Sequence, residues 1–173
     1  QNVYNVMSYG AKGNGVADDA TAIQKAINKC EQNGGGMVLF PSNHIFISGP
    51  LQLKSNVELH LETSATLKAN PNEAIYKISA FGKNEGEGML WIWAKNADNI
   101  SITGKGCIHG NGISFMGKEL SDSYELKPVT TFDPRPHVLS LTDVRNLTIK
   151  DITIREGAYW TVHLIGCNGE IGR

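Results

Sequence analysis

Near the end of the sequence, one pattern of residues returns after 23 positions. Leu139 and Leu141, in the segment 135–146, align with Val162 and Leu164 in the later copy. Apolar and polar residues alternate in both copies, which is typical of a strand with one buried face. A repeat of this length, filled with short strands and turns, is typical of one rung of a β-solenoid. We therefore predict a solenoid, in preference to the sandwich or barrel that many short strands would otherwise favour.

An earlier segment, residues 90–99, fits the same template and places Ile92 at the position of Leu139. Ile92 lies 47 residues before Leu139, and we interpret residues 111–134 as a long loop inserted into that rung. Stacked rungs form parallel sheets whose strands lie about 4.8 Å apart.

The chain after residue 36 alternates with a period of two residues, and turns rich in Gly, Asn and Asp separate the alternating segments. Strands are expected at residues 37–40, 45–47, 57–61, 90–93, 100–103, 138–141, 147–149, 152–154 and 162–165. Asn99 and Asn146 match the pattern of N-glycosylation acceptors. Each also opens one of these segments, so we interpret both as strand starts.

One amphipathic helix precedes the strands, over about residues 18–33. Its apolar stripe, spaced i, i+3, i+4, i+7, consists of Ile23, Ala26, Ile27 and Cys30. Asp18 and Asp19 suit the cap of its first turn better than a catalytic pair, and three glycines after Asn33 end it. We expect the helix to cover the first rung, whose apolar interior and open strand edge would otherwise promote aggregation.

Length and charge limit the class of protein. With 173 residues, 40% of them hydrophobic, the chain suffices for a single domain over residues 1–173. A formal net charge of −1 attracts it neither to nucleic acid nor to an anionic membrane, and no apolar run approaches the roughly 20 residues of a membrane span. Cys30, Cys107 and Cys167 lack metal-site spacing and are interpreted as small buried residues. No metal or other cofactor is expected.

Several segments resemble a known group of proteins. Residues 9–19, the helix and residues 34–41 resemble the N-terminal signature of the pectin-lyase-like superfamily. Similarity to the polygalacturonase family, glycoside hydrolase family 28, is found in residues 47–61, residues 99–106, the pair Arg135-Pro136 and residues 159–167. The resemblance implies an all-β fold: a right-handed parallel β-helix with a short N-terminal capping helix.

The resemblance implies inverting hydrolysis of galacturonide-type bonds in a pectic polysaccharide or oligosaccharide. Inversion needs two carboxyl groups roughly 6.5–9.5 Å apart, one acting as acid and one as base. In the family, Asn-Thr-Asp, Asp-Asp, Gly-His-Gly and Arg-Ile-Lys segments follow the Trp-Thr-x-His rung, and none of them follows it here. We therefore assign no catalytic residue and expect the chain to stop before the catalytic rungs and to be inactive alone. Its open end is expected to self-associate or to meet a missing C-terminal part.

Two other functions stay open. A non-catalytic glycan-binding or structural β-helix fits the missing carboxylate segments. A polysaccharide lyase fits less well, because acidic clusters for Ca²⁺ do not stand out. A secreted, periplasmic or cell-surface location is expected. The start at Gln1 fits a removed secretion signal or an artificial first residue.

Alternation predicts the side chains that face a substrate groove. With Leu139 and Leu141 turned to the core, the outward residues are Val138, Ser140, Thr161 and His163. Thr161 and His163 are the candidate groove floor, where His163 would hydrogen-bond a sugar hydroxyl or a uronate. The alternative for His163 is a solvated or structural histidine.

Trp91 and Trp93 share this outward parity, and their faces suit stacking on sugar rings; the alternative is packing under the inserted loop. Arg135 either pairs with a carboxylate in bidentate fashion or only clamps its turn. Trp160 has core parity and is expected to pack. Solvated charges on the inserted loop are the interpretation of Asp122, Glu125 and Asp133.

Overall fold

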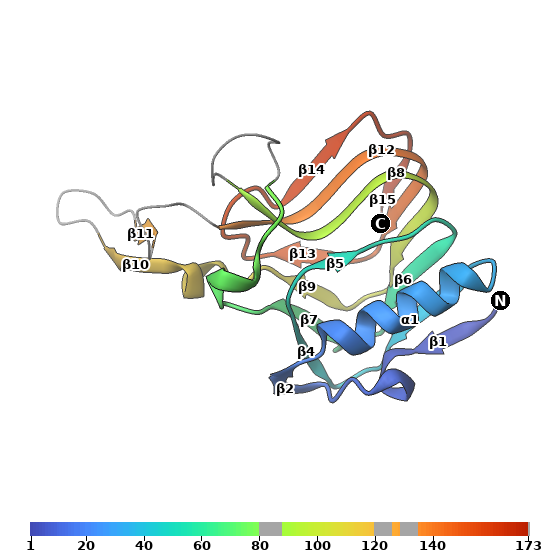
Figure 1. Cartoon of the computed structure of the whole chain (residues 1–173), viewed down its shortest axis with the longest axis horizontal. Coiled ribbons are helices and arrows are strands. Elements are labelled where there is room, and N and C mark those ends of the chain that lie inside the picture. The colour runs from blue at the N-terminus through green and yellow to red at the C-terminus, as the bar shows by residue number, and fades with distance from the viewer. Residues whose placement is uncertain (80–87, 120–125, 129–134, 173) are drawn as a thin grey trace.

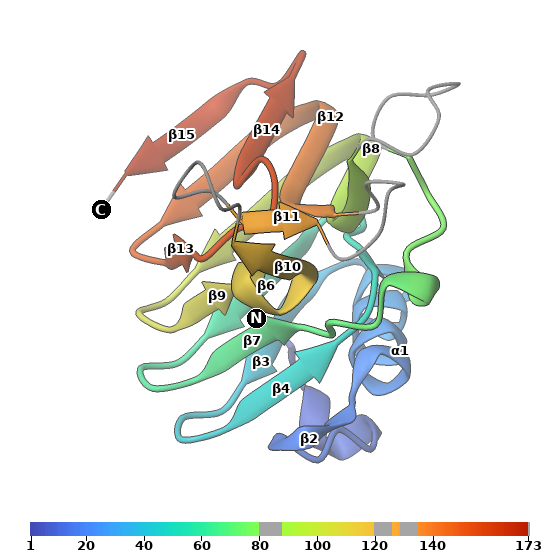
Figure 2. The ribbon, with the colours of Figure 1, turned by 90° about the vertical axis from the view of Figure 1, so that its left-hand side faces the viewer.

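The computed structural model of the chain describes residues 1–79, 88–119, 126–128 and 135–172. Its strands wind into stacked rungs of a right-handed parallel β-helix, as the resemblance implied (Figures 1 and 2). The helical elements are η1 (Val6–Tyr9), α1 (Ala20–Gln32), η2 (Glu73–Ile75) and η3 (Gly112–Phe115). None of the helices in these ranges is long and apolar enough to cross a membrane.

One sheet has the strand order β1-β3-β6-β8-β12-β14, with β5 paired to β8 and β15 paired to β12. Its strands are β1 (Val3–Asn5), β3 (Gly36–Phe40), β5 (Leu51–Gln52), β6 (Val57–Leu61), β8 (Met89–Thr103), β12 (Pro136–Lys150), β14 (Val162–Ile165) and β15 (Gly169–Gly172). The N-terminal halves of β8 and β12 pair with β5 and β14, and their C-terminal halves pair with β6 and β15. Each long strand therefore serves two faces of the solenoid.

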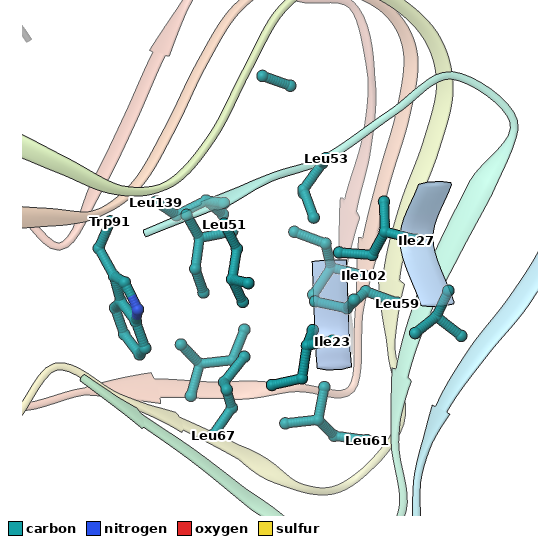
Figure 3. Close-up of a cluster of buried hydrophobic side chains, with 14 of the residues drawn as sticks. Ile23, Ile27, Leu51, Leu53, Leu59, Leu61, Leu67, Trp91, Ile102 and Leu139 are labelled. Atoms are coloured by element: carbon teal, nitrogen blue, oxygen red, sulfur yellow. The ribbon is translucent and has the colours of Figure 1, made fainter. Parts of the chain in front are cut away.

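A second parallel sheet has the order β13-β9-β7-β4-β2. Its strands are β2 (Asn14–Asp18), β4 (Ile45–Ser48), β7 (Thr66–Ala69), β9 (Cys107–His109) and β13 (Thr153–Arg155). Between the two sheets lies a continuous apolar core, part of which Figure 3 shows.

The alignment of rungs predicted from the repeat is confirmed in register. Leu139 pairs with Val162 and Leu141 with Leu164, and Ile92 pairs with Leu139. The side chains of Ile92, Leu139 and Leu141 are fully buried. The periodicity of the sequence thus identified neighbouring positions on successive rungs.

The predicted helix is α1, and its stripe is buried as expected. Ile23 and Ile27 point into the interior beside Leu59 and Leu61 (Figure 3). The helix also contacts β1, β3 and η1, so it covers the N-terminal end of the solenoid.

The two aspartates before the helix divide the predicted capping role. Asp18 accepts a hydrogen bond from the backbone N–H of Ala20 (2.7 Å) at the helix start. Asp19 makes no side-chain cap bond; instead its carboxylate, 3% exposed, accepts from the backbone N–H groups of Lys12 (2.8 Å) and Gly13 (3.0 Å). Asp19 is therefore the N-cap residue by position, as expected, but its side chain fixes the preceding loop and does not cap the helix.

Within the predicted insertion, residues 111–134, the structure describes η3 and the antiparallel pair β10 (Met116–Glu119) and β11 (Leu126–Pro128), which lie to one side of the solenoid (Figure 1). Asp122, Glu125 and Asp133 lie outside the described residues, so the interpretation of these acids as solvated charges stays a prediction.

Candidate functional site

Four side chains from successive rungs form a row on the outer face of one sheet, which we call the groove row. They are Gln52 of β5, Trp93 of β8, Ser140 of β12 and His163 of β14, each paired in register with the next. The row follows from the alternation of the strands. Leu51, Ile92 and Leu139 are paired in register and face the core, so the next residue on each strand turns outward. The outward direction predicted for Trp93 and His163 is confirmed.

A pocket of about 320 Å³ lies over three residues of this row, Trp93, Ser140 and His163. It is lined by Ile78, Ser79, Leu90, Trp93, Ala94, Lys95, Ser140, Thr142, His163 and Ile165. Lys95, Thr142 and Ile165 belong to a second row, two positions further along the same strands. The pocket therefore combines an indole, a hydroxyl-bearing floor, an imidazole and an ammonium group. None of the described residues that line it carries a carboxylate.

His137 lies beneath one end of the groove row and is completely buried. Its Nδ1 lies 3.3 Å from the Ser140 hydroxyl, and its ring centroid lies 5.5 Å from that of His163. Burial, reinforced by the nearby His163, lowers the pKa of His137 to about 4. His137 is therefore a neutral imidazole at neutral pH and supports two residues of the row. Sequence reasoning did not single it out.

An aromatic group continues from His137 toward the start of β14. Trp160 meets His163 edge-on, with 4.7 Å between the ring centroids, and stacks parallel to Tyr159 at 6.0 Å. Trp160 is 46% exposed, so the expectation that it packs in the core was wrong. Its ring lies on the surface beside the groove row.

Arg135 joins two rungs next to this aromatic group. Its Nη1 donates to the carbonyl of Ala158 (3.2 Å), and its guanidinium lies over the ring of Tyr159, 5.1 Å from the centroid. These contacts correspond to the clamping role that the sequence left open. A carboxylate-binding role for Arg135 stays a prediction.

Trp91 differs from the sequence expectation. It is fully buried, and its indole N–H donates to the carbonyl of Gly49 (3.1 Å); Figure 3 shows it in the same interior cluster as Leu51. Ile92 is fully buried as well, so two consecutive residues of β8 face inward. Strict alternation fails at this point of the strand, and the outward placement of Trp91 was wrong.

The same irregularity recurs one rung later. Val138 and Leu139 are both buried, and Val138 lies against Gly110, where an added Cβ would come within 2.8 Å of it. The hydroxyl of Thr161 faces Gly157 in the same way, at 2.6 Å from the Cβ position. Val138 is therefore not outward, and Thr161 does not line the pocket.

Other pocket residues were not singled out from the sequence. Lys95 and Thr142 share the parity of Trp93 and Ser140, so alternation alone was sufficient to find them. Ile78 and Ser79 follow η2, and no periodic signal places that segment beside β8. There the backbone N–H of Leu90 donates to the carbonyl of Ile78 (2.9 Å).

Comparison with known proteins identifies the family. The family described as rhamnogalacturonase A/epimerase, pectate lyase-like, matches residues 3–158. The chain belongs to this family. The sequence is 38% identical over 121 residues to an exo-poly-alpha-D-galacturonosidase of Dickeya chrysanthemi, covering 64% of this chain and 20% of that protein. It is also 30% identical over 155 residues to the plasmin and fibronectin-binding protein A of Streptococcus pneumoniae, covering 88% of this chain and 20% of that protein.

Solved structures share the fold. An exopolygalacturonase of Thermotoga maritima superposes with a TM-score of 0.77 at 23% identity, covering 99% of this chain and 47% of that one. The resemblance to polygalacturonases is thus confirmed. The chain spans about a fifth of the length of the two curated relatives above.

Proposed function

We propose that this chain forms part of the substrate groove of a hydrolase acting on pectic polysaccharide. The observation that carries the proposal is the pocket over the groove row, which joins Trp93, Lys95, Ser140 and His163. Similarity to polygalacturonases supports galacturonide chains as the substrate class.

Each pocket residue suits one feature of a galacturonide. The indole of Trp93 offers an apolar face to a sugar ring, and stacking of this kind excludes water from both. The ammonium of Lys95 pairs with a uronate carboxylate. Ser140 and His163 supply hydrogen-bonding groups for hydroxyls. The pocket thus accounts for binding of an acidic sugar.

The same pocket does not account for cleavage. Inverting hydrolysis needs a carboxylic acid and a carboxylate on opposite sides of one bond, and the lining residues that the structure describes include neither. We propose that this chain by itself binds the polysaccharide without hydrolysing it. We further propose that the protein acts outside the cytoplasm, where pectic polymers are met.

Titration with oligogalacturonate tests the binding role. Replacing Trp93 with Ala, or Lys95 with Gln, is expected to weaken binding about tenfold, since each removes roughly 1–1.5 kcal/mol of contact. Lys105→Gln, at an exposed turn away from the pocket, is the matched control and is expected to bind as the parent does. If Trp93→Ala binds oligogalacturonate as tightly as the parent does, the sugar site does not lie in this pocket.

A second candidate function is adhesion without catalysis. It is favoured by the similarity to the plasmin and fibronectin-binding protein A, together with the lack of carboxylates among the described residues of the pocket. Binding of this chain to fibronectin or plasmin, surviving the Trp93→Ala change and exceeding binding to oligogalacturonate, would favour adhesion. Preference for oligogalacturonate would favour the groove.

The last rung exposes apolar side chains. Val162, Ile165 and Ile171 are 43%, 50% and 64% exposed. We propose that further rungs or a second copy of the chain cover them, as at other solenoid ends. Sedimentation of the 173-residue chain tests self-association, which Ile171→Lys, at the end of the solenoid and outside the pocket over the groove row, is expected to abolish.

A further inference from the structure

A row of basic side chains crosses the second sheet. Lys68 of β7 pairs in register with His109 of β9, and His109 pairs with Arg155 of β13. Leu67 and Ile108, beside the first two, are fully buried, so the three basic side chains face outward. Figure 2 shows β7, β9 and β13 stacked on successive rungs. We call these three residues the basic row.

Among the described residues, the basic row makes no close ion pair with an acid, although Glu156 acts electrostatically on His109. Within the described residues, no carboxylate lies within 4.0 Å of the side-chain nitrogens of Lys68, His109 or Arg155. The pKa of His109 is lowered by burial first and then by Lys68 and Arg155, whereas Glu156 opposes the shift. Lys68 and Arg155 therefore both lie close enough to act electrostatically on His109. The row is a local concentration of basic groups in a protein whose net charge is −1.

His109 contributes a hydrogen-bond donor to this row. Its Nδ1 accepts from the backbone N–H of Asn111 (3.0 Å), which leaves the ring proton of the neutral imidazole on Nε2. Beside the basic row, the same strands carry Thr66, Cys107 and Thr153 in a parallel outward row. Each of the three rungs thus presents one cation or hydrogen-bond donor in the basic row: Lys68, His109 and Arg155. The hydroxyls of Thr66 and Thr153 flank the row.

We infer that the basic row is a second polysaccharide-binding surface, which holds a uronate polymer along the stacking direction of the rungs. Rungs repeat every 4.7–4.9 Å or so, so Lys68 and Arg155, two rungs apart, lie roughly 10 Å from each other along the stacking direction and can pair with two carboxylates of one polymer. Single-stranded nucleic acid fits less well, because its binding sites use aromatic platforms for the bases. The outward residues of β4, β7, β9 and β13 include no Trp, Tyr or Phe.

This surface is separate from the groove row, which lies on the other sheet. The choice of a uronate polymer as its ligand rests on the proposed function. The surface itself rests on the register and the charges. A binding site outside the groove would keep the protein on its polymer while the groove engages individual sugars.

The test measures binding of immobilised polygalacturonate to four proteins by biolayer interferometry. These are the parent, Lys68→Gln/Arg155→Gln, the matched control Lys25→Gln/Lys29→Gln, and the groove variant Trp93→Ala/His163→Ala. The control removes two cations from the exposed side of α1 and keeps the same net charge as the basic-row variant. Fully methyl-esterified polygalacturonan, which has no charge, and single-stranded DNA are the comparison polymers.

The basic-row variant is expected to bind polygalacturonate about tenfold more weakly than the control, with the difference shrinking at high salt. Binding to the esterified polymer is expected to be equal for both. Equal affinity of basic-row variant and control for polygalacturonate would overturn the inference. So would tighter binding of DNA than of polygalacturonate through the same residues. A groove variant that binds like the parent would count against the proposed function alone.

Discussion

Asn146 donates a hydrogen bond from its side-chain amide to the side-chain oxygen of Asn99 on the neighbouring rung, at 2.7 Å. Asn99 donates in the same way to Asn56, at 2.9 Å. All three adopt a left-handed backbone, with φ between 55° and 65°. The ladder therefore lies where the long strands β8 and β12 bend, and it joins three rungs at that corner. A glycan on the amide of Asn99 or Asn146 would break it.

Replacing Asn99 with Ala is expected to lower the free energy of unfolding by about 2–4 kcal/mol. The change removes two side-chain hydrogen bonds, and it places an alanine in left-handed backbone. Asn96→Ala is the matched control, because Asn96 also has a positive φ (52°) but takes no part in the ladder. Urea denaturation of both variants separates the two costs, and equal losses would show that the ladder contributes nothing.

The helix over the end of the solenoid gives a second prediction. Ile23→Asp or Ile27→Asp is expected to cost about 3–5 kcal/mol or to prevent folding, since a carboxylate would be buried among apolar side chains. Lys25→Asp, on the exposed side of the same helix, controls for charge and helix propensity. Thermal melts of the Ile23 variant that match the Lys25 variant would show that α1 does not seal the core.

The strands β8, β12 and β14 show which parts of the structure could be predicted from the sequence. Ile92, Leu139 and Val162 were aligned correctly because a solenoid repeats its apolar pattern at a fixed interval. The directions of Trp91 and Val138 were wrong for a different reason. A bend that turns two consecutive residues inward leaves no trace in a pattern of alternating apolar residues, because both residues are apolar anyway.

The basic row shows the complementary limit. Lys68, His109 and Arg155 each alternate correctly within their own strands, yet the strands are three or four residues long and widely separated in the sequence. Only the pairing of β7 with β9 and of β9 with β13 brings them together. Lys68 and His109 are 41 residues apart and His109 and Arg155 are 46 apart, so no constant interval in the sequence reveals this register.

His137 predicts a pH dependence of stability. Its pKa is lowered from the ordinary 6.5 to about 4 in the folded protein, by burial and then by His163. Between these values the unfolded chain binds a proton that the folded chain does not, so stability rises with pH there and the contribution of this group is constant above about pH 7. From pH 7 to pH 5 the loss is expected to be about 2 kcal/mol.

Urea denaturation of the parent and of His137→Asn at both pH values measures this effect. The variant is expected to lose less stability on acidification, whatever its stability at pH 7. An identical difference between pH 7 and pH 5 in the two proteins would assign the pH dependence to other groups.

The two neighbouring tryptophans are expected to respond in opposite ways. Trp91→Phe removes one of the two donors to the buried Gly49 carbonyl, which also accepts from the Ser48 hydroxyl (2.8 Å), and it shrinks a fully buried side chain. It is expected to cost about 1–3 kcal/mol, with oligogalacturonate binding unchanged. Trp93→Phe is expected to change stability by less than about 0.5 kcal/mol while weakening binding. Denaturation and titration of both variants check this, and weaker binding by the Trp91 variant alone would reverse the assignment.

The 173-residue chain is expected to bind polygalacturonate without cleaving it. Inverting hydrolysis requires two carboxyl groups across one glycosidic bond, and the pocket over the groove row has none among the lining residues in the described part of the chain. A reducing-sugar assay with the purified chain, run beside an intact polygalacturonase, measures this directly on polygalacturonate and on rhamnogalacturonan. Turnover that persists through repurification and disappears in Asp122→Asn or Asp133→Asn would place the catalytic acid on the insertion between β9 and β12. The groove row would then be the binding half of an active site completed within this chain.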